Sequence, residues 1–288
     1  MIITRVIGGL GNQLFQYAVG RQLAEILGVE LKLDVSGFKT YKLRAYSLDS
    51  FNIKQNLASP EEIARLTVRS LISRALLRLK GKKAGLLKTH IVEKKQFRFD
   101  PEVLMQPDGG YLDGYWQTEK YFKNIEGLVR EVCTLRNAPA GKDLEIAAQM
   151  ASCESVSLHI RRGDYVSNPQ VYQACGVCPL SYYTAAVDEV SKSVRAPHFF
   201  IFSDDIEWCK KNLSIPFPVT FVGHNGPDKD YEDLRLISLC RHQIIANSSF
   251  SWWGAWLNPN PQKKVIAPKQ WFKDRDTRDL IPEGWLRL

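Results

Sequence analysis

Two adjacent arginines at the end of an apolar run are the side chains in this chain best suited to bind an anion. Residues 156–160 have the composition of a buried strand. The residues that follow them directly are Arg161, Arg162, Gly163 and Asp164. A guanidinium donates in a planar fork that matches phosphate oxygens better than a lysine ammonium does. The cluster therefore favours an anionic ligand, a nucleotide diphosphate, over an ordinary surface ion pair.

The geometry of a strand predicts how these side chains are arranged. Side chains alternate between the two faces of a strand, so His159 and Arg161 share one side and Arg162 starts on the other. Ligands of open α/β sheets bind at the carboxyl ends of the strands, where this cluster stands. Gly163 allows a tight turn at that end, and Asp164 is expected to hold one arginine in place.

A pair of carboxylates follows a second expected strand. Asp204 and Asp205 come after the apolar residues 198–202, where a carboxylate would accept hydrogen bonds from ribose hydroxyls or from a guanine edge. The alternative is that they cap a helix starting near Glu207, and at least one of them is expected to do so.

A strand-to-helix junction rich in hydroxyl groups is a second candidate phosphate site. Its residues are Asn247, Ser248, Ser249, Phe250 and Ser251. Serine hydroxyls and free N–H groups at the start of a helix are well suited to phosphate. The tryptophans that follow have helical spacing and are expected to pack mostly in the core.

The amino-terminal segment predicts a glycine-rich turn between a strand and a helix. It contains Gly8, Gly9 and Gly11, followed by Asn12 and Gln13. Such turns direct backbone N–H groups and the positive end of a helix toward an anion. Leu14 stands where the dinucleotide fingerprint has its third glycine, and no P-loop lysine follows. Asn12 is expected either to cap the helix or to contact a sugar.

Metal and redox chemistry are not expected. The Asp-x-Asp pairs at 228–230 and 274–276 each enclose a cation, which is typical of solvated charge. Fixed positive charge on Arg161 and Arg162 would neutralise a diphosphate in place of a divalent metal, so we predict no metal and no cofactor. The six cysteines are scattered, which favours reduced thiols, and the Cys175–Cys178 spacing favours a structural loop over a redox or zinc pair.

Alternating strand and helix patterns predict parallel sheets joined by helical crossovers. The first part of the chain has strand patterns at 2–7, 29–33 and 111–116, a helix pattern at 12–27, a short helix after Gln117 and irregular residues over 38–108. The second part has strand patterns at 156–160, 198–202, 219–222, 243–246 and 264–267, the last closing the sheet, and helix patterns at 181–194, 207–212, 231–240 and 251–257. A linker is expected near 137–142. We predict an α/β fold with two Rossmann-like domains, 1–140 and 141–288, that face each other across a cleft.

The 288 residues carry a net charge of +8. Much of this excess lies over 65–98, where basic and apolar residues predict an amphipathic helix ending near Gly81. An outer helix is the ordinary interpretation, and peripheral contact with an anionic membrane is the alternative. A nucleic-acid partner is not expected, because no reading motif is present. Neither a membrane-spanning run nor a signal peptide is found, which predicts a cytoplasmic protein, with the inner face of the cell membrane as the alternative location.

Three segments resemble a known family when they are taken together and in order. They are residues 8–18 (Gly-Gly-Leu-Gly-Asn-Gln-Leu-Phe-Gln-Tyr-Ala), 159–165 (His-Ile-Arg-Arg-Gly-Asp-Tyr) and 247–257 (Asn-Ser-Ser-Phe-Ser-Trp-Trp-Gly-Ala-Trp-Leu). Together they resemble the bacterial α-1,2-fucosyltransferases of glycosyltransferase family 11. The arginine segment alone is shared with α-1,6-fucosyltransferases and protein O-fucosyltransferases. Tyr115 and Gln117, within 113–117, also look familial.

The resemblance implies a GT-B fold in which the domain over 1–140 lies on the acceptor side and the domain over 141–288 binds GDP-β-L-fucose as donor. It also implies inversion at the anomeric carbon and no metal requirement. By similarity, Arg161 would contact the β-phosphate with support from Arg162, and Asp164 would orient an arginine. His159 and one of Asp204 or Asp205 would read guanine or ribose, and Ser249 with its neighbours Asn247, Ser248, Phe250 and Ser251 would hold phosphate. Asn12 would lie near the fucose, and the further substrate-binding candidates are Gly11, Gln13, Tyr115 and Gln117. The catalytic base stays open among Asp164, Asp34 and Asp113, and a strongly dissociative route with weak base assistance is the alternative.

The sequence therefore predicts an inverting galactoside 2-α-L-fucosyltransferase. It would move L-fucose from GDP-β-L-fucose to the 2-hydroxyl of a terminal β-galactoside, in a galactose-terminated oligosaccharide or a lipid-linked glycan of a surface polysaccharide. One alternative is a fucosyltransferase with another acceptor or linkage, such as O-fucosylation. Another is a non-catalytic nucleotide- or glycan-binding protein, against which the intact arginine, aspartate and serine set argues.

Overall fold

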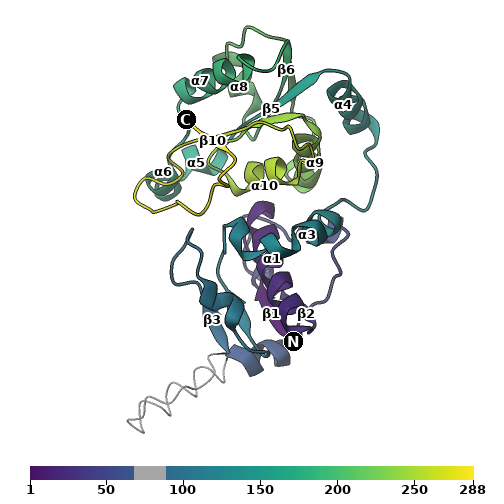
Figure 1. The fold of residues 1–288 in the computed structure, drawn as a ribbon, viewed down its shortest axis with the longest axis vertical. Coiled ribbons are helices and arrows are strands. Elements are labelled where there is room, and N and C mark those ends of the chain that lie inside the picture. The colour runs from purple at the N-terminus through teal and green to yellow at the C-terminus, as the bar shows by residue number, and fades with distance from the viewer. Residues whose placement is uncertain (68–88) are drawn as a thin grey trace. The chain divides into compact units, whose positions relative to one another are not determined.

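The computed structural model describes residues 1–67 and 89–288 (Figure 1). The chain divides into two compact units: Met1–Thr134 with Arg278–Leu280, and Leu135–Thr277 with Ile281–Leu288. The domain boundary predicted from the sequence, after residue 140, lies a few residues later than this division. The short segment Arg278–Leu280 joins the first unit through Asp279, whose carboxylate accepts from Lys120 Nζ at 2.7 Å and from Arg98 Nε at 3.2 Å.

The first unit is built on a four-stranded parallel sheet in the order β2-β1-β4-β3. Its strands are β1 (Ile2–Arg5), β2 (Leu31–Asp34), β3 (His90–Val92) and β4 (Tyr111–Asp113). Its α-helices include α1 (Leu10–Leu27) and α3 (Glu126–Val132), and residues 60–67 are also helical. Short 3-10 helices connect them at Ser36–Lys39, Leu48–Ser50, Pro101–Met105, Glu119–Tyr121 and Lys123–Ile125.

Helix α1 follows the glycine-rich turn and ends where the sequence predicts. Gly28 has a φ of 61°, a left-handed backbone that favours glycine and terminates the helix. The helix begins at Leu10, with Gly9 as its N-cap, so Asn12 lies inside the first turn and the capping role considered for it is wrong.

Two expectations for the first unit are corrected. The predicted strand over 111–116 ends at Asp113, because Glu93 accepts hydrogen bonds from the backbone N–H groups of Tyr115 and Trp116 and draws them out of the sheet. The irregular region over 38–108 contains β3, whose three residues are too few for an alternating pattern. The predicted basic helix falls mostly on 68–88, outside the described residues.

The second unit has a six-stranded parallel sheet in the order β10-β9-β8-β5-β6-β7. Its strands are β5 (Glu154–Ile160), β6 (Pro197–Ser203), β7 (Val219–Val222), β8 (His242–Ile244), β9 (Val265–Ala267) and β10 (Leu286–Arg287). Its helices are α4 (Gly141–Ala151), α5 (Gly163–Ser167), α6 (Pro169–Cys175), α7 (Leu180–Ser191), α8 (Ile206–Asn212), α9 (Asp230–Leu239) and α10 (Ser249–Leu257), with a 3-10 turn at Pro227–Lys229. Strand β9 does not close the sheet as predicted, because β10 pairs beside it.

Both faces of the second sheet are covered, which explains its continuous apolar strands. On one face, alternate residues of β5 such as Leu158 pack with Val187 and other residues of α7. On the other face, Phe200 and Phe202 of β6 pack with residues of α4 and α9. A strand buried on both sides holds its carboxyl end in a fixed position, and that end carries the arginines.

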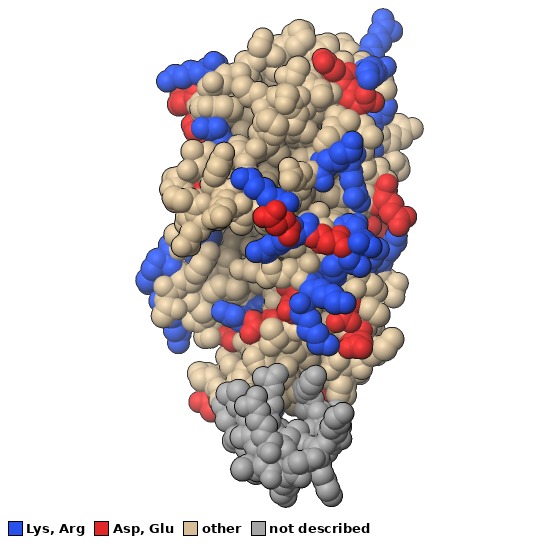
Figure 2. All heavy atoms as spheres, turned by 90° about the vertical axis from the view of Figure 1, so that its left-hand side faces the viewer, with Lys and Arg blue, Asp and Glu red and all other residues tan. Residues whose placement is uncertain are grey.

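Surface charge is mixed on the face drawn in Figure 2, where Lys and Arg are interspersed with Asp and Glu. The described residues include no helix that is both long enough and apolar enough to cross a bilayer.

Candidate functional site

The strand order of the second unit reverses between β5 and β8. The chain enters this sheet at β5, adds β6 and β7 on one side, and then returns to add β8 on the other. In open α/β sheets, ligands bind at the carboxyl ends of the strands where the order reverses in this way. The arginine segment follows β5, and the serine segment follows β8, so the fold brings both to this point.

Arg161 is held by two carboxylates, one in helix α5 and one in the loop that follows strand β6. Its Nη1 lies 2.7 Å from Asp204 Oδ2, and its Nη2 donates to Asp164 Oδ1. Asp204 follows β6, which pairs with β5 so that Ile160 lies opposite Ser203. The two strands therefore end together, and the register brings Arg161 and Asp204 into contact.

Arg162 is fixed by a different set of contacts. Its Nε donates to Asp205 Oδ2 at 3.1 Å, and its guanidinium lies over the Trp208 ring, 3.8 Å from the ring centroid. Its backbone N–H donates to Asp204 Oδ1 at 2.8 Å. The Asp204 carboxylate thus binds both arginines: it contacts the side chain of Arg161 and the backbone N–H of Arg162.

The two arginines keep donors for a ligand. Within the described residues, these contacts use two of the five N–H groups of Arg161 and one of those of Arg162. Their side chains are only 20% and 18% exposed, so little water would need to be displaced by an anion. The carboxylates of Asp164, Asp204 and Asp205 therefore hold the two guanidinium groups in place before a ligand binds.

Asp204 approaches Gly163 so closely that it leaves no room for a Cβ atom there. A Cβ built on Gly163 would lie 2.4 Å from Asp204 Oδ2, the atom that binds Arg161. The glycine predicted to allow a turn therefore also makes room for the carboxylate that positions the arginine.

The aspartates and serines occupy places close to those the sequence predicts. Asp205 caps α8 by accepting from the Trp208 N–H at 3.2 Å, which confirms the expected cap. Ser248 is the N-cap of α10, but its side chain makes no capping hydrogen bond. The Tyr165 hydroxyl donates to the Asn247 carbonyl at 3.1 Å and ties this helix start to the arginine segment.

Two residues of the serine segment are structural. The Asn247 amide donates to the carbonyls of Cys175 and Trp271, at 3.1 Å and 3.2 Å. Ser251 is fully buried, and its hydroxyl donates back to the carbonyls of Ala246 and Ser248. Ser248 and Ser249 stand at the start of α10.

His159 is buried beside the arginines and is neutral. Its exposed fraction is 5%, its Nδ1 has no partner among the described residues, and its ring lies 5.5 Å from that of Phe250. Burial, and then the charge of Arg161, lower the pKa of His159 from 6.5 to about 3. The unpaired nitrogen is itself buried, so the structure does not present it to a ligand.

The burial of His159 predicts a pH dependence of stability. Between pH 6.5 and 3 the unfolded chain binds one more proton at this residue than the folded chain does. Above pH 6.5, His159 is mostly neutral in both the folded and the unfolded chain, so it does not change stability. Below pH 6.5, the free energy of unfolding falls by about 1.4 kcal/mol for each pH unit. Urea unfolding of the wild type and of His159→Phe between pH 4 and 7 measures this difference. The prediction would be contradicted if the free energy of unfolding depended on pH in the same way in both proteins.

The predicted residues of the first unit gather at the carboxyl ends of β1 and β4. The Gln117 Nε2 donates to Asn12 Oδ1 at 2.7 Å, which joins the loop after β4 to helix α1 beside Gly11. Gln13 is fully buried, and its amide binds the backbone of Gly8, Ala45 and Ser47. Gln13 therefore fixes the glycine-rich turn at Gly8 to the loop at residues 45–47.

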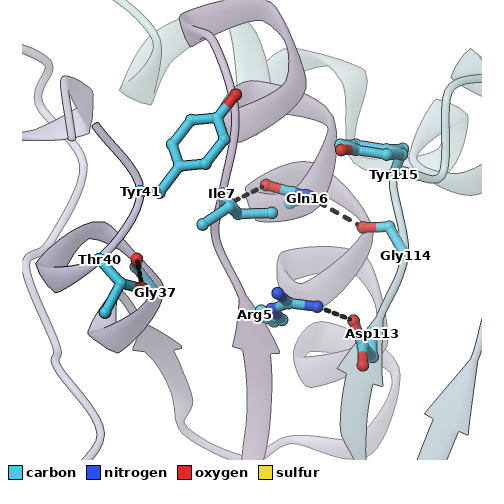
Figure 3. Close-up of a pocket in the computed structure, with 9 residues that line it drawn as sticks. All are labelled: Arg5, Ile7, Gln16, Gly37, Thr40, Tyr41, Asp113, Gly114 and Tyr115. Carbon is cyan, nitrogen blue, oxygen red and sulfur yellow. Dashed lines mark hydrogen bonds and ion pairs between the residues drawn. The ribbon is translucent and has the colours of Figure 1, made fainter. Parts of the chain in front are cut away.

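Some residues of these sites are absent from the sequence prediction. Arg5 ends β1 and pairs with Asp113 at 2.9 Å (Figure 3), and a charged residue at a strand end is the same signal that identifies Arg161. Trp208 has no such signal, because a residue that stacks on an arginine follows no local pattern.

Comparisons with known proteins show which family the chain resembles. The model of the family described as glycosyl transferase family 11 matches residues 102–287. An α-1,2-colitosyltransferase of Escherichia coli is 35% identical over 100% of this chain and 99% of its own. The O-antigen biosynthesis glycosyltransferase WbnK of Escherichia coli is 30% identical over 98% of each. Human galactoside alpha-(1,2)-fucosyltransferase 1 is 34% identical over 87% of this chain and 63% of its own.

A solved structure shows the fold. Arabidopsis thaliana FUT1, in a complex with GDP, superposes with a TM-score of 0.53 at 10% identity, over 92% of this chain and 70% of that one. This likeness and the two parallel sheets confirm the predicted α/β fold of the GT-B type. The family match over most of the chain and the bacterial relatives at 30% identity or more give one conclusion: the chain belongs to glycosyltransferase family 11.

Proposed function

We propose that this protein transfers L-fucose from GDP-β-L-fucose to the 2-hydroxyl of a terminal β-galactoside, with inversion at the anomeric carbon. The observation that carries the proposal is the fixed pair of guanidiniums at the strand-order reversal, beside the start of α10. The α-1,2 linkage in the names of relatives supports the position of the new bond.

The proposed chemistry uses the arginines on the leaving group. The galactose 2-hydroxyl would attack the anomeric carbon as the bond to the β-phosphate oxygen breaks, and the hydroxyl proton would pass to a base or to solvent. Negative charge grows on the β-phosphate of the departing GDP, and the sugar acquires oxocarbenium character. Arg161 and Arg162 would stabilise that charge with little reorganisation, because Asp164, Asp204 and Asp205 already hold them. The N–H groups at the start of α10, together with Ser248 and Ser249, would bind the pyrophosphate.

A second donor sugar is favoured by one observation. The 35% identical relative is named for transfer of colitose, which lacks the 3-hydroxyl of fucose. The arginine site would act on the same leaving group with either sugar. The preference between the two donors would then depend on the side chains that contact the 3-hydroxyl of fucose.

Product analysis tests the proposed function. The purified protein is incubated with GDP-fucose, or with GDP-colitose, and with lactose, Galβ1-3GlcNAc or Galβ1-3GalNAc. We expect fucose to be transferred and NMR to show an α-1,2 linkage to galactose. Transfer of colitose alone would replace the proposed donor, another linkage would replace the proposed acceptor position, and absence of both transfer and donor hydrolysis would contradict catalysis.

Transfer is expected to need no added metal. The guanidinium pair supplies positive charge where many glycosyltransferases would use a divalent cation. The rate in excess EDTA should equal the rate with Mg²⁺ or Mn²⁺. An activity lost in EDTA and restored by either ion would overturn this expectation.

A further inference from the structure

We infer that Trp208 is a positioning residue, whose indole ring fixes the plane of the Arg162 guanidinium so that it donates to the β-phosphate of the donor. The inference rests on the proposed function and adds to it a residue that acts through another. It starts from a difference between the two arginines. Arg161 is held by two carboxylates, whereas Arg162 is held by one carboxylate and one aromatic ring.

The contact between Arg162 and Trp208 is close and largely out of water. The Cζ atom of Arg162 lies over the indole, 3.8 Å from the ring centroid, and the arginine side chain is 18% exposed. Indole gives a cation the most favourable of the aromatic faces, and the attraction is larger where water is excluded. The corresponding distance from Arg161 to the ring of Tyr165 is 5.4 Å, so the ring contact is the tighter one at Arg162.

An aromatic ring holds a guanidinium without cancelling its charge. Asp164 and Asp204 bring two negative charges to the single positive charge of Arg161. The side chain of Arg162 pairs with one carboxylate, that of Asp205. A second carboxylate in the place of the indole would make the site repel a pyrophosphate more strongly. The ring therefore fixes Arg162 at no cost in attraction for an anion.

The indole and Asp205 together leave one edge of the Arg162 guanidinium for a ligand. Its Nε donates to Asp205 Oδ2 at 3.1 Å, and within the described residues Nη1 and Nη2 have no hydrogen-bond partner. These two nitrogens carry four N–H groups that lie in the guanidinium plane. With Nε bound and one face on the ring, the group has little freedom to rotate, so this edge is preorganised for phosphate oxygens.

Trp208 is itself held by the residue that binds Arg162. Asp205 accepts from the backbone N–H of Trp208 at 3.2 Å and caps α8. The Trp208 side chain is partly buried and packs against the apolar cluster that includes Leu158 and Val187. The start of α8 thus presents a carboxylate and, three residues later, a ring to the same guanidinium.

The affinities for GDP and GMP test the inference, because GMP lacks the β-phosphate. In Trp208→Leu, calorimetry should show GDP binding weakened about 3- to 30-fold, the range expected for a cation–π contact, and GMP binding unchanged. Trp208→Phe keeps an aromatic face and should retain most of the GDP affinity. The matched control is Phe217→Leu, because Phe217 packs on the same apolar cluster, beside Phe199. That variant should bind both nucleotides as the wild type does.

A double-mutant cycle separates positioning from a general structural role. In an Arg162→Ala background, Trp208→Leu should change the GDP affinity by less than about twofold, because Trp208 acts only through the guanidinium. The inference is wrong if Trp208→Leu keeps the wild-type GDP affinity, weakens GDP and GMP equally, or has its full effect without Arg162.

The same measurements distinguish failure of the inference from failure of the proposed function. If Arg162→Ala loses the preference for GDP over GMP but Trp208→Leu keeps it, the donor chemistry stands and the role of Trp208 is wrong. If Arg162→Ala keeps that preference, Arg162 does not bind the β-phosphate and the inference fails with that assignment. If the wild type binds no GDP, the proposed function itself fails.

Discussion

Replacing Arg161 with alanine is expected to lower the rate of sugar transfer on the order of 10²–10³-fold, the cost of losing a fixed donor to developing charge. The guanidinium is held by Asp164 and Asp204 at the carboxyl end of β5, where the leaving β-phosphate is proposed to lie. Alanine would remove this donor and leave the two carboxylates without their cation. Initial rates with GDP-fucose and lactose measure the effect.

The matched control is Arg241→Ala. Arg241 pairs with Glu154 at the opposite end of β5, and both side chains are substantially exposed, so the pair should contribute little to stability and nothing to transfer. Arg161→Lys keeps the charge but not the planar fork, and it should recover only part of the rate. Near-normal transfer by a folded Arg161→Ala protein would contradict the assignment of Arg161 to the leaving group.

A single methyl group at Gly163 is expected to impair transfer about tenfold or more, because misplacing a catalytic group by about 1 Å can cost 10²-fold. The added Cβ would lie 2.4 Å from Asp204 Oδ2, so Asp204 must move and Arg161 loses its 2.7 Å partner. Only a partly exposed carboxylate has to shift, so the protein should still fold.

The control for this variant is Gly284→Ala in the same unit. A Cβ at Gly284 meets no atom within 4 Å in the described part of the chain, so transfer should be unaffected. The melting temperatures of both variants should stay within a few degrees of the wild type. Wild-type kinetics for Gly163→Ala would show that the Asp204–Arg161 contact is dispensable.

The sequence predicts the second unit well because its strands are buried on both faces. A continuous apolar run such as 156–160 or 198–202 has visible ends, and the polar residues at those ends are then assigned to one edge of the sheet. Arg161, Asp204 and Ser249 are identified in this way. The pairing of Arg161 with Asp204 needs the register of β5 on β6, which no local pattern contains.

The first unit is harder to predict because its contacts are not local. The end of β4 at Asp113 is decided by Glu93, which lies on the loop after a three-residue strand. The difference between Asp34 and Asp113 also depends on tertiary structure, since Tyr111 and Ser36 bind the first carboxylate and Arg5 and His90 contact the second.

A crystal structure of the GDP complex tests the central claim most directly. We predict guanidinium nitrogens of Arg161 and Arg162 within about 2.7–3.2 Å of the β-phosphate oxygens. We also predict that Asp164, Asp204 and Asp205 keep their places on the arginines and that the start of α10 faces the pyrophosphate. A pyrophosphate bound elsewhere, with both guanidiniums directed away from it, would contradict the account.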